Sequence, residues 1–290
     1  MEIEFTDNVS KNLLDVLGPS FSQANEIRFG VAFAKYSGFS LIEDDIKECL
    51  RNGGQIEFLL GLDFRTTEPK VLRAILELAR SGLTTRLFCF SDPSLRDTPV
   101  YHPKIYLIRA GDKSIVSIGS SNLTFGGLKG NVEVNVVIEA NTEEEIVSDA
   151  YGVYNRLKFQ KGRFEPDFTY VDNYEEAYEV VRRRNVEALK EKSTKKKIKE
   201  LKEREKTLPK PKPTPAELFG WQRLVYERLP EGVFQTSAMY LYEREFRQFY
   251  PENRHIRDKT RQILQQLRDL RLVKHISENK WQRINGGNDG

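Results

Sequence analysis

The sequence predicts an α/β protein with a mixed sheet flanked by helices, followed by a smaller, mainly helical domain. Strand-like and helical runs alternate between residues 25 and 90, and three strand-like runs follow with little helix between them. A proline-rich stretch at 207–215 then separates these runs from a helix-rich end. A chain of 290 residues that is 39% hydrophobic is long enough to bury two cores, so we expect two domains.

The first half has the rhythm of a layered α/β unit. Its runs are, in order, a β-rich run at 25–35, a helix at 41–53, a buried strand at 55–62, a helix at 71–82 and a strand at 84–90. Gly53-Gly54 and Gly82 end the two helices. The order predicts a sheet that is parallel in part.

The next segment favours antiparallel pairing. Strand-like runs occupy 100–108, 114–120 and 132–140, and the turn at Ala110-Gly111-Asp112-Lys113 joins the first two. A helix from about Glu143 to Leu157 closes the unit. We therefore expect residues 1–170 to form the first domain.

A linker and a second domain complete the predicted organisation. Residues 173–206 form a polar, charge-dense helical pattern, and prolines 209, 211, 213 and 215 favour an extended spacer, which predicts a linker at 171–215. Beyond it we expect helices at 216–229, 239–250 and 258–271 and two short β segments at 272–284, giving a second domain at 216–285 and a flexible tail at 286–290.

The net charge of +3 hides an asymmetry. Residues 1–181 hold 19 Lys and Arg against 28 Asp and Glu (−9), residues 182–212 hold 14 against 5 (+9), and residues 213–290 hold 13 against 10 (+3). A polyanion would be attracted to the second half. The first half could accept one only at a locally cationic site.

The order helix, helix, helix and hairpin in the second domain is that of a winged helix-turn-helix, with 258–271 as the recognition helix. The candidate DNA-binding residues are Arg254, Arg257, Lys259 and Arg261 at the entrance of that helix and Lys280 in the wing. The alternative interpretation is a small protein-interaction domain with a solvated basic face.

The composition argues against several classes. No window approaches the roughly 18 uninterrupted apolar residues of a membrane-spanning helix, and the acidic, polar start MEIEFTDNVSKN does not resemble a signal peptide, so we expect a cytoplasmic protein with no membrane partner. Cys49 and Cys89 are too few for a disulfide framework or a zinc cluster. We expect no structural metal.

Residues that carry chemistry are concentrated between 101 and 133. Period-2 strand geometry puts His102 and Lys104 on one face, and the antiparallel turn brings Gly119-Ser120-Ser121-Asn122 beside them. Glu133 follows at the start of the third run. A cation, an amide, a hydroxyl and a carboxylate can therefore converge on one imidazole.

At these positions the chain resembles the phospholipase D superfamily, whose motif is His-x-Lys followed by Gly-Ser-x-Asn; the matching residues are His102, Lys104, Gly119, Ser120 and Asn122. Within it the chain looks most like the metal-independent nucleases, including restriction endonucleases, in which a downstream Glu, here Glu133, joins the site. The resemblance covers about residues 1–160. The family motif has Asp five residues after the Lys, whereas this chain has Arg109, which counts against the lipase branch.

The resemblance implies a mechanism. His102 attacks phosphorus to form a phosphohistidine, while a second histidine protonates the leaving group and then activates water. Lys104 and Asn122 hold the phosphoryl oxygens, Ser120 assists, and Glu133 accepts a hydrogen bond from the ring nitrogen opposite the reacting one. Neither a metal nor another cofactor is required.

The mechanism needs two histidines, and the chain has one motif. His255 and His275 have no Lys two residues on, so the resemblance implies a homodimer, formed through the nuclease domain, with one shared site. The sequence thus predicts a metal-independent DNA endonuclease, of a restriction or phage-defence type, that could work beside a companion methyltransferase or helicase that the sequence does not show. The alternatives are a lipid phosphodiesterase and a catalytically inactive DNA-binding regulator.

Overall fold

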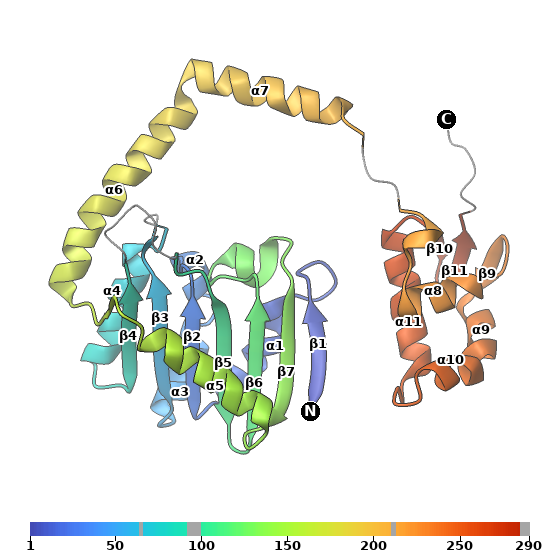
Figure 1. Ribbon diagram of the computed structural model, residues 1–290, viewed down its shortest axis with the longest axis horizontal. Helices are drawn as coiled ribbons and strands as arrows, with labels where there is room; N and C mark the ends of the chain where they lie inside the picture. Colours follow the sequence, from blue (N-terminus) through green and yellow to red (C-terminus); the bar gives the residue numbers. More distant parts are fainter. Residues whose placement is uncertain (64–65, 92–99, 210–212, 285–290) are drawn as a thin grey trace. The chain divides into compact units, whose positions relative to one another are not determined.

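The computed structural model describes residues 1–63, 66–91, 100–209 and 213–284. The chain divides into two compact units, residues 1–196 and 197–290 (Figure 1). Each unit has its own hydrophobic core.

The first unit is built on an eight-stranded sheet in the order β1-β7-β6-β5-β2-β3-β4-β8. The strands are β1 (Glu2–Thr6), β2 (Glu26–Val31), β3 (Gln55–Gly61), β4 (Thr85–Phe90), β5 (Lys104–Ala110), β6 (Lys113–Gly119), β7 (Asn135–Asn141) and β8 (Arg163–Phe164). Strands β2, β3 and β4 are parallel, whereas β5, β6, β7 and β1 pair antiparallel. This mixed sheet confirms the predicted fold class.

Helices cover the two faces of the sheet unequally (Figure 1). On one face lie α1 (Leu13–Phe21), α2 (Tyr36–Phe39), α3 (Glu43–Arg51) and α4 (Pro69–Arg80), which bury the larger core around Phe29, Phe58 and Tyr106. On the other face α5 (Glu145–Lys158) alone crosses the strands and covers a smaller core that includes Leu107, Val116 and Tyr154.

Helix α6 (Phe168–Lys190) begins on the first unit. Val171 and Tyr174 are buried in the larger core, and Tyr174 donates a hydrogen bond to the backbone oxygen of Thr67 at 2.8 Å. The predicted range 1–170 therefore ends before the last residues that pack into this core. Helix α7 (Lys192–Thr207) buries no residue.

The predicted spacer and tail lie partly outside the described residues, since 210–212 and 285–290 are not among them. The described end of the spacer is a 3-10 turn at Pro215–Glu217, which Thr214 and Glu217 close as a capping box.

The second unit has the strand and helix order of a winged helix-turn-helix. Its elements are α8 (Gly220–Glu227), β9 (Val233–Gln235), α9 (Thr236–Met239), α10 (Glu243–Phe249), α11 (Ile256–Asp269), β10 (Val273–Ser277) and β11 (Lys280–Arg283). The strands form one sheet in the order β10-β11-β9. The helix expected at 239–250 is instead divided into α9, a 3-10 turn at Tyr240–Tyr242 and α10.

None of the helices in the described part of the chain has the length and apolar character needed to cross a membrane.

Candidate active site

His102 and Lys104 are brought together at the start of β5. Lys104 is the first residue of the strand and pairs with Val31 at the end of β2. Its side chain is buried, and Nζ lies 2.6 Å from Nδ1 and 3.1 Å from Nε2 of His102, which is itself exposed. Nζ also donates to the backbone oxygen of His102 at 3.0 Å. The predicted imidazole and ammonium therefore form one contact pair.

The surroundings of this pair favour a neutral imidazole. Although His102 is exposed overall, partial desolvation of its ring, and then the positive charge of Lys104, lower the pKa of His102 below its ordinary value of 6.5. Burial also lowers the pKa of Lys104, while the carboxylate of Glu133 acts in the opposite direction and favours the ammonium form. A neutral ring has the free lone pair that a nucleophile needs.

The end of β6 carries the next part of the motif. A side chain at position 119 would place its Cβ 2.3 Å from the backbone oxygen of Val134, so only glycine fits there. Ser120 then pairs with Val134 through its backbone N–H and accepts from the Val134 N–H at its Oγ, each at 3.0 Å. Ser120 Oγ also donates to Glu133. The motif thus ties the end of β6 to the segment before β7.

Asn122 is oriented by its own amide oxygen. Oδ1 accepts a hydrogen bond from the backbone N–H of Phe33 at 3.2 Å, and the next residue, Leu123, forms a β-bridge with Ala34. Within the residues that the structure describes, the amide nitrogen of Asn122 has no hydrogen-bond partner. It is therefore available to donate to a substrate oxygen.

Asn135 is a positioning residue that the sequence reasoning did not select. Its side chain is 1% exposed; it donates to Ser121 Oγ at 2.9 Å and Thr6 Oγ1 at 3.1 Å, and it accepts from the Ser121 N–H at 3.2 Å. It holds β1, β7 and the Ser120–Asn122 segment together. An amide inside the apolar run VEVNVVIEA was the available signal.

Glu133 is close to the other motif residues but in a different pairing from the one expected. Its carboxylate accepts from Ser120 Oγ and, at 3.3 Å, from Asn131 Nδ2. Among the described residues it forms no hydrogen bond with His102. The contact between Glu133 and the ring therefore stays a prediction.

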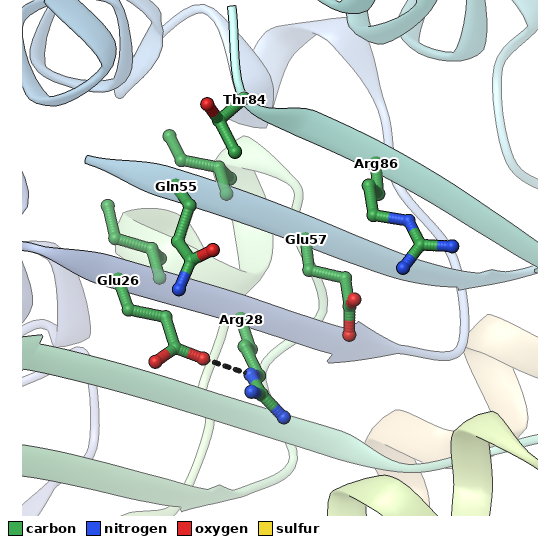
Figure 2. Close-up of a pocket in the computed structure, with 8 residues that line it drawn as sticks. Glu26, Arg28, Gln55, Glu57, Thr84 and Arg86 are labelled. Carbon is green, nitrogen blue, oxygen red and sulfur yellow. Dashed lines mark hydrogen bonds and ion pairs between the residues drawn. The ribbon is translucent and has the colours of Figure 1, made fainter. Parts of the chain in front are cut away.

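The cavity in Figure 2 belongs to the other end of the sheet. It has a volume of about 60 Å³ and lies among side chains from the first halves of β2, β3 and β4, with the carboxylate of Glu26 directed at Arg28. Its lining contains acids and bases but no histidine. It is a small cavity among charged side chains at the start of β2, whereas Lys104 pairs with Val31 at the end of that strand.

No group of three or more His, Cys, Asp or Glu side chains within the described ranges is arranged to hold a metal ion.

The candidate DNA-binding residues of the second unit lie on and beside α11. Arg257 pairs with Glu243 at 2.7 Å, and Arg261 donates to Tyr240 Oη at 2.9 Å and pairs with Asp258. Lys259 donates to Gln262 at 2.9 Å. Arg254 is exposed, as is Lys280, the first residue of β11, beyond the turn at Glu278-Asn279.

The same helix also carries two exposed amides, Gln262 and Gln265. The sequence analysis did not select them because it considered only positively charged side chains. Glutamine can read adenine with two hydrogen bonds, so a search for exposed amides on the recognition helix would have found them.

Comparisons with known proteins agree with this division. Residues 24–156 match the family model described as "Cardiolipin synthase, PLD-like domain", and residues 223–283 match the model described as "Dam-replacing HTH domain". The first unit therefore contains a phospholipase D-like domain, and the second contains a helix-turn-helix domain of the Dam-replacing type. This confirms the family resemblance.

Solved structures similar to the chain include NucT from Helicobacter pylori, with 14% identity and a TM-score of 0.44, over 57% of this chain and 99% of that one. They also include the phospholipase D family member Nuc from Salmonella typhimurium, with 15% identity and a TM-score of 0.42, over 57% and 97%. Phosphatidylserine synthase from Haemophilus influenzae Rd KW20 has 13% identity and a TM-score of 0.45, over 65% and 46%. No curated protein matches the chain.

Proposed function

We propose that the protein is a metal-independent DNA endonuclease that hydrolyses phosphodiester bonds through a phosphohistidine on His102. The observation that carries the proposal is the contact of Lys104 Nζ with the His102 ring, in a setting that lowers the pKa of the imidazole. A neutral nucleophile with an ammonium beside it suits attack on an anionic diester.

The reaction has two steps. In the first, a ring nitrogen of one neutral His102 forms a bond to phosphorus, the bond to the leaving oxygen breaks, and His102 of the partner subunit, which starts in its protonated form, gives that oxygen a proton. In the second, the same partner histidine takes a proton from water, whose oxygen attacks phosphorus as the P–N bond breaks. Both imidazoles return to their starting forms.

The other motif residues stabilise the charge that develops on phosphorus. Lys104 supplies the positive charge, the free amide nitrogen of Asn122 donates to a non-bridging oxygen, and Ser120 assists. Glu133 keeps Lys104 in its ammonium form and orients Ser120. No step requires a metal ion.

The proposal of a shared catalytic centre rests on the number of histidines in the first unit. His102 is the one histidine in residues 1–196, because the others are His255 and His275. A homodimer formed through the first unit supplies the second imidazole by symmetry.

The substrate class follows from the second unit. A helix-turn-helix domain with basic side chains around α11 suits duplex DNA, and the Dam-replacing type of this domain supports a role in restriction or phage defence. Arg254, Arg257, Lys259, Arg261 and Lys280 contact phosphates or base edges. A companion methyltransferase or helicase would fit such a system.

The test is incubation with duplex DNA in excess EDTA, followed by acid-labile labelling of His102 from a labelled diester. Cleavage with label on His102 supports the proposal. Hydrolysis of phospholipid alone would assign the lipid phosphodiesterase, and DNA binding without cleavage would assign an inactive regulator.

A further inference from the structure

A groove with cationic and aromatic walls lies on the α5 side of the sheet, where β4 meets the short edge strand β8. It has a volume of about 350 Å³. Figure 1 shows α5 crossing the sheet and ending beside β4. We call this space the edge groove; the walls that matter here are formed by Arg86, Phe88, Lys158, Phe159 and Arg163.

The edge groove concentrates positive charge in a unit that is acidic as a whole. Residues 156–163, which run from the last turn of α5 to the start of β8, hold four Lys and Arg and no Asp or Glu. Residues 1–181 together carry a net charge of −9. The edge groove is therefore a locally cationic site, which is what a polyanion needs in order to bind this unit.

Aromatic rings hold the cations of the groove in place. The guanidinium carbon of Arg86 lies 4.7 Å from the centre of the Phe88 ring, and Lys158 Nζ lies 4.5 Å from the same ring centre. The guanidinium carbon of Arg163 lies 4.0 Å from the ring centre of Phe90. Each charged group thus has a fixed position along the groove.

The carboxylates near the groove do not balance all of these cations. Arg86 pairs with Glu165 at 2.9 Å, but both side chains are more than half exposed, so the pair can be exchanged for a phosphate at small cost. Arg163 has no carboxylate within ion-pair distance among the described residues. Burial lowers the pKa of Arg163 below its ordinary value. An anion in the groove would supply the missing negative charge.

Phe159 forms the rim of the groove. Its side chain is 77% exposed at the end of α5, and Lys158 Nζ lies 5.3 Å from its ring centre. A single exposed ring is common on protein surfaces. An exposed ring beside a cationic groove is, however, the arrangement that binds single strands of nucleic acid, because the cations contact phosphates and the ring stacks on a base.

The groove leads toward the candidate active site. Arg86 and Phe90 lie four residues apart on one face of β4, about 13 Å along the strand. Arg163, which pairs with Phe90 in the sheet, has its guanidinium carbon 4.6 Å from the ring centre of Tyr101. Tyr101 immediately precedes His102. A strand that passes through the groove can therefore reach the imidazole a few nucleotides further along.

We propose that the edge groove binds an unpaired nucleotide of the strand that is cut at His102. A phosphate of that strand contacts Arg86 and Arg163, and the base stacks on Phe159. The inference rests on the proposed function and adds a second contact point for its substrate. The base is unpaired because bases inside a duplex present only their edges. A volume of about 350 Å³ is at the lower end for ligand sites and suits one nucleotide.

Binding by the full His102→Ala chain, in which the strand is not turned over, tests the role of the ring. The probes are a labelled oligothymidylate of about ten nucleotides and an abasic strand with the same phosphates. Phe159→Ala should weaken binding of the oligothymidylate at least about fivefold and leave binding of the abasic strand unchanged. Phe159→Trp, which keeps a stacking ring, should bind the oligothymidylate at least as tightly as the parent chain.

The fluorescence of Phe159→Trp locates the contact. The parent chain contains Trp221 and Trp281, both in the second unit, so the difference between the two spectra reports the indole at the groove. Oligothymidylate should quench that difference signal, because a stacked base contacts the ring. The abasic strand should not quench it.

Substitution of Arg86 tests the phosphate contact. Arg86→Gln should weaken binding of both strands and reduce the slope of log K against log salt concentration by about 0.7, the value for one phosphate on a single strand. The matched control is Arg80→Gln, since Arg80 is 68% exposed and pairs with Glu77 on α4, which covers the opposite face. It should bind both strands as the parent does. Circular dichroism spectra identical to that of the parent check that each variant is folded.

The outcomes separate the two proposals. Folded Phe159→Ala and Arg86→Gln variants that bind both strands like the parent, with no quenching in Phe159→Trp, would overturn the edge groove and leave the proposed function intact. Quenching by phosphatidylglycerol vesicles but not by oligothymidylate would assign a lipid headgroup to the groove and would also overturn the inference. The expected binding pattern, together with a wild-type chain that cleaves no DNA, would sustain the groove as a nucleotide site and overturn the proposed function.

Discussion

The two units of the chain divide chemistry and charge between them. The first unit has a large core, a net charge of −9 over residues 1–181, and one cluster in which an imidazole, an ammonium and a carboxylate interact. The second unit is a small winged helix whose exposed basic residues lie around α11. Under the proposed function, this difference predicts that the part that reacts with a phosphodiester is not the part that attracts DNA.

The two sets of cations are also held differently. Lys104 is buried and fixed beside His102, whereas Arg257 and Arg261 lie on the surface in contact with Glu243, Asp258 and Tyr240. Exposed ion pairs contribute about 0–1 kcal/mol, so these arginines can exchange their acidic partners for phosphates at small cost. This difference agrees with the proposed roles, in which Lys104 takes part in the chemistry and the arginines bind DNA.

The largest effect that this division predicts is on turnover alone. His102→Ala should lower DNA cleavage by at least about 10³-fold, because each shared centre loses both its nucleophile and its acid. Dimerisation and DNA affinity should stay as in the wild type. The matched control is His255→Ala in the second unit, whose side chain is 81% exposed and which should cleave normally. Wild-type turnover by His102→Ala would contradict the proposed mechanism.

Truncation after residue 181, which removes the second unit together with the end of α6 and the basic residues that follow it, should separate DNA affinity from catalysis. A chain of residues 1–181 keeps Val171 and Tyr174 in the core but loses α11, so its DNA affinity should fall by about 10³-fold, near the lower end of the gap between specific and non-specific binding. Hydrolysis of bis(p-nitrophenyl) phosphate should stay within about twofold of the full chain. Sequence-selective cleavage by the truncated protein would place DNA reading in the first unit.

Substitution of the arginines sharpens the same point. Arg257→Ala and Arg261→Ala should each lower DNA affinity by about 1–3 kcal/mol if they contact base edges, or act equally on all sequences if they contact phosphates. Arg223→Ala, which removes a 67% exposed arginine from α8, is the control. Binding titrations on matched and unmatched duplexes distinguish the two cases, and unchanged affinity for both would contradict the assignment of α11 as the reader.

The smallest predicted effect is a shift in pH dependence. Since partial burial and Lys104 hold the pKa of His102 below 6.5, the acidic limb of kcat/KM for the small diester should lie below that value. The partner histidine that gives up a proton adds an opposing limb at higher pH. Lys104→Gln removes the positive charge, which makes protonation of His102 easier, so the acidic limb should move to higher pH as well as lose rate. Lys113→Gln, in the distant β5–β6 turn, should leave the limb in place. An acidic limb that stays in place in Lys104→Gln would show that the charge of Lys104 does not influence the pKa of His102.

The sequence predicted most of the sheet because its inner strands are marked by local patterns. Runs around β2, β3 and β4 are buried on both faces and separated by helices that end at glycine, and the β5–β6 turn has a two-residue hairpin signature. It did not predict β1 or α1, because an edge strand with the alternation EIEFT and a helix that contains Pro19 carry weak signals of their own. Strand β9 has three residues and depends on its pairing with β11.

The site was predictable in its residue types and less so in its contacts. Strand geometry alone predicts that His102 and Lys104 share a face and that Gly-Ser-x-Asn follows the neighbouring strand. The structure has the contact of His102 with Lys104 and the pairing of β5 with β6. The hydrogen bond of Asn122 with Phe33 and the network of Asn135 join residues 89 and 129 positions apart in the sequence, which no local pattern encodes. The hydrogen bond that Glu133 accepts from Ser120, in place of the one expected from His102, likewise depends on the packing of the segment before β7.

The most direct test of the central claim, that two His102 residues share one catalytic centre, is a subunit-mixing measurement. Wild-type and His102→Ala chains are co-expressed in equal amounts under separate tags, and hydrolysis of the small diester is measured per total dimer. If both imidazoles are required, only wild-type homodimers are active, so the activity should be about one quarter of the wild-type value and should vary with the square of the wild-type fraction. An activity of about one half, linear in that fraction, would show that each chain works alone and would contradict the shared centre.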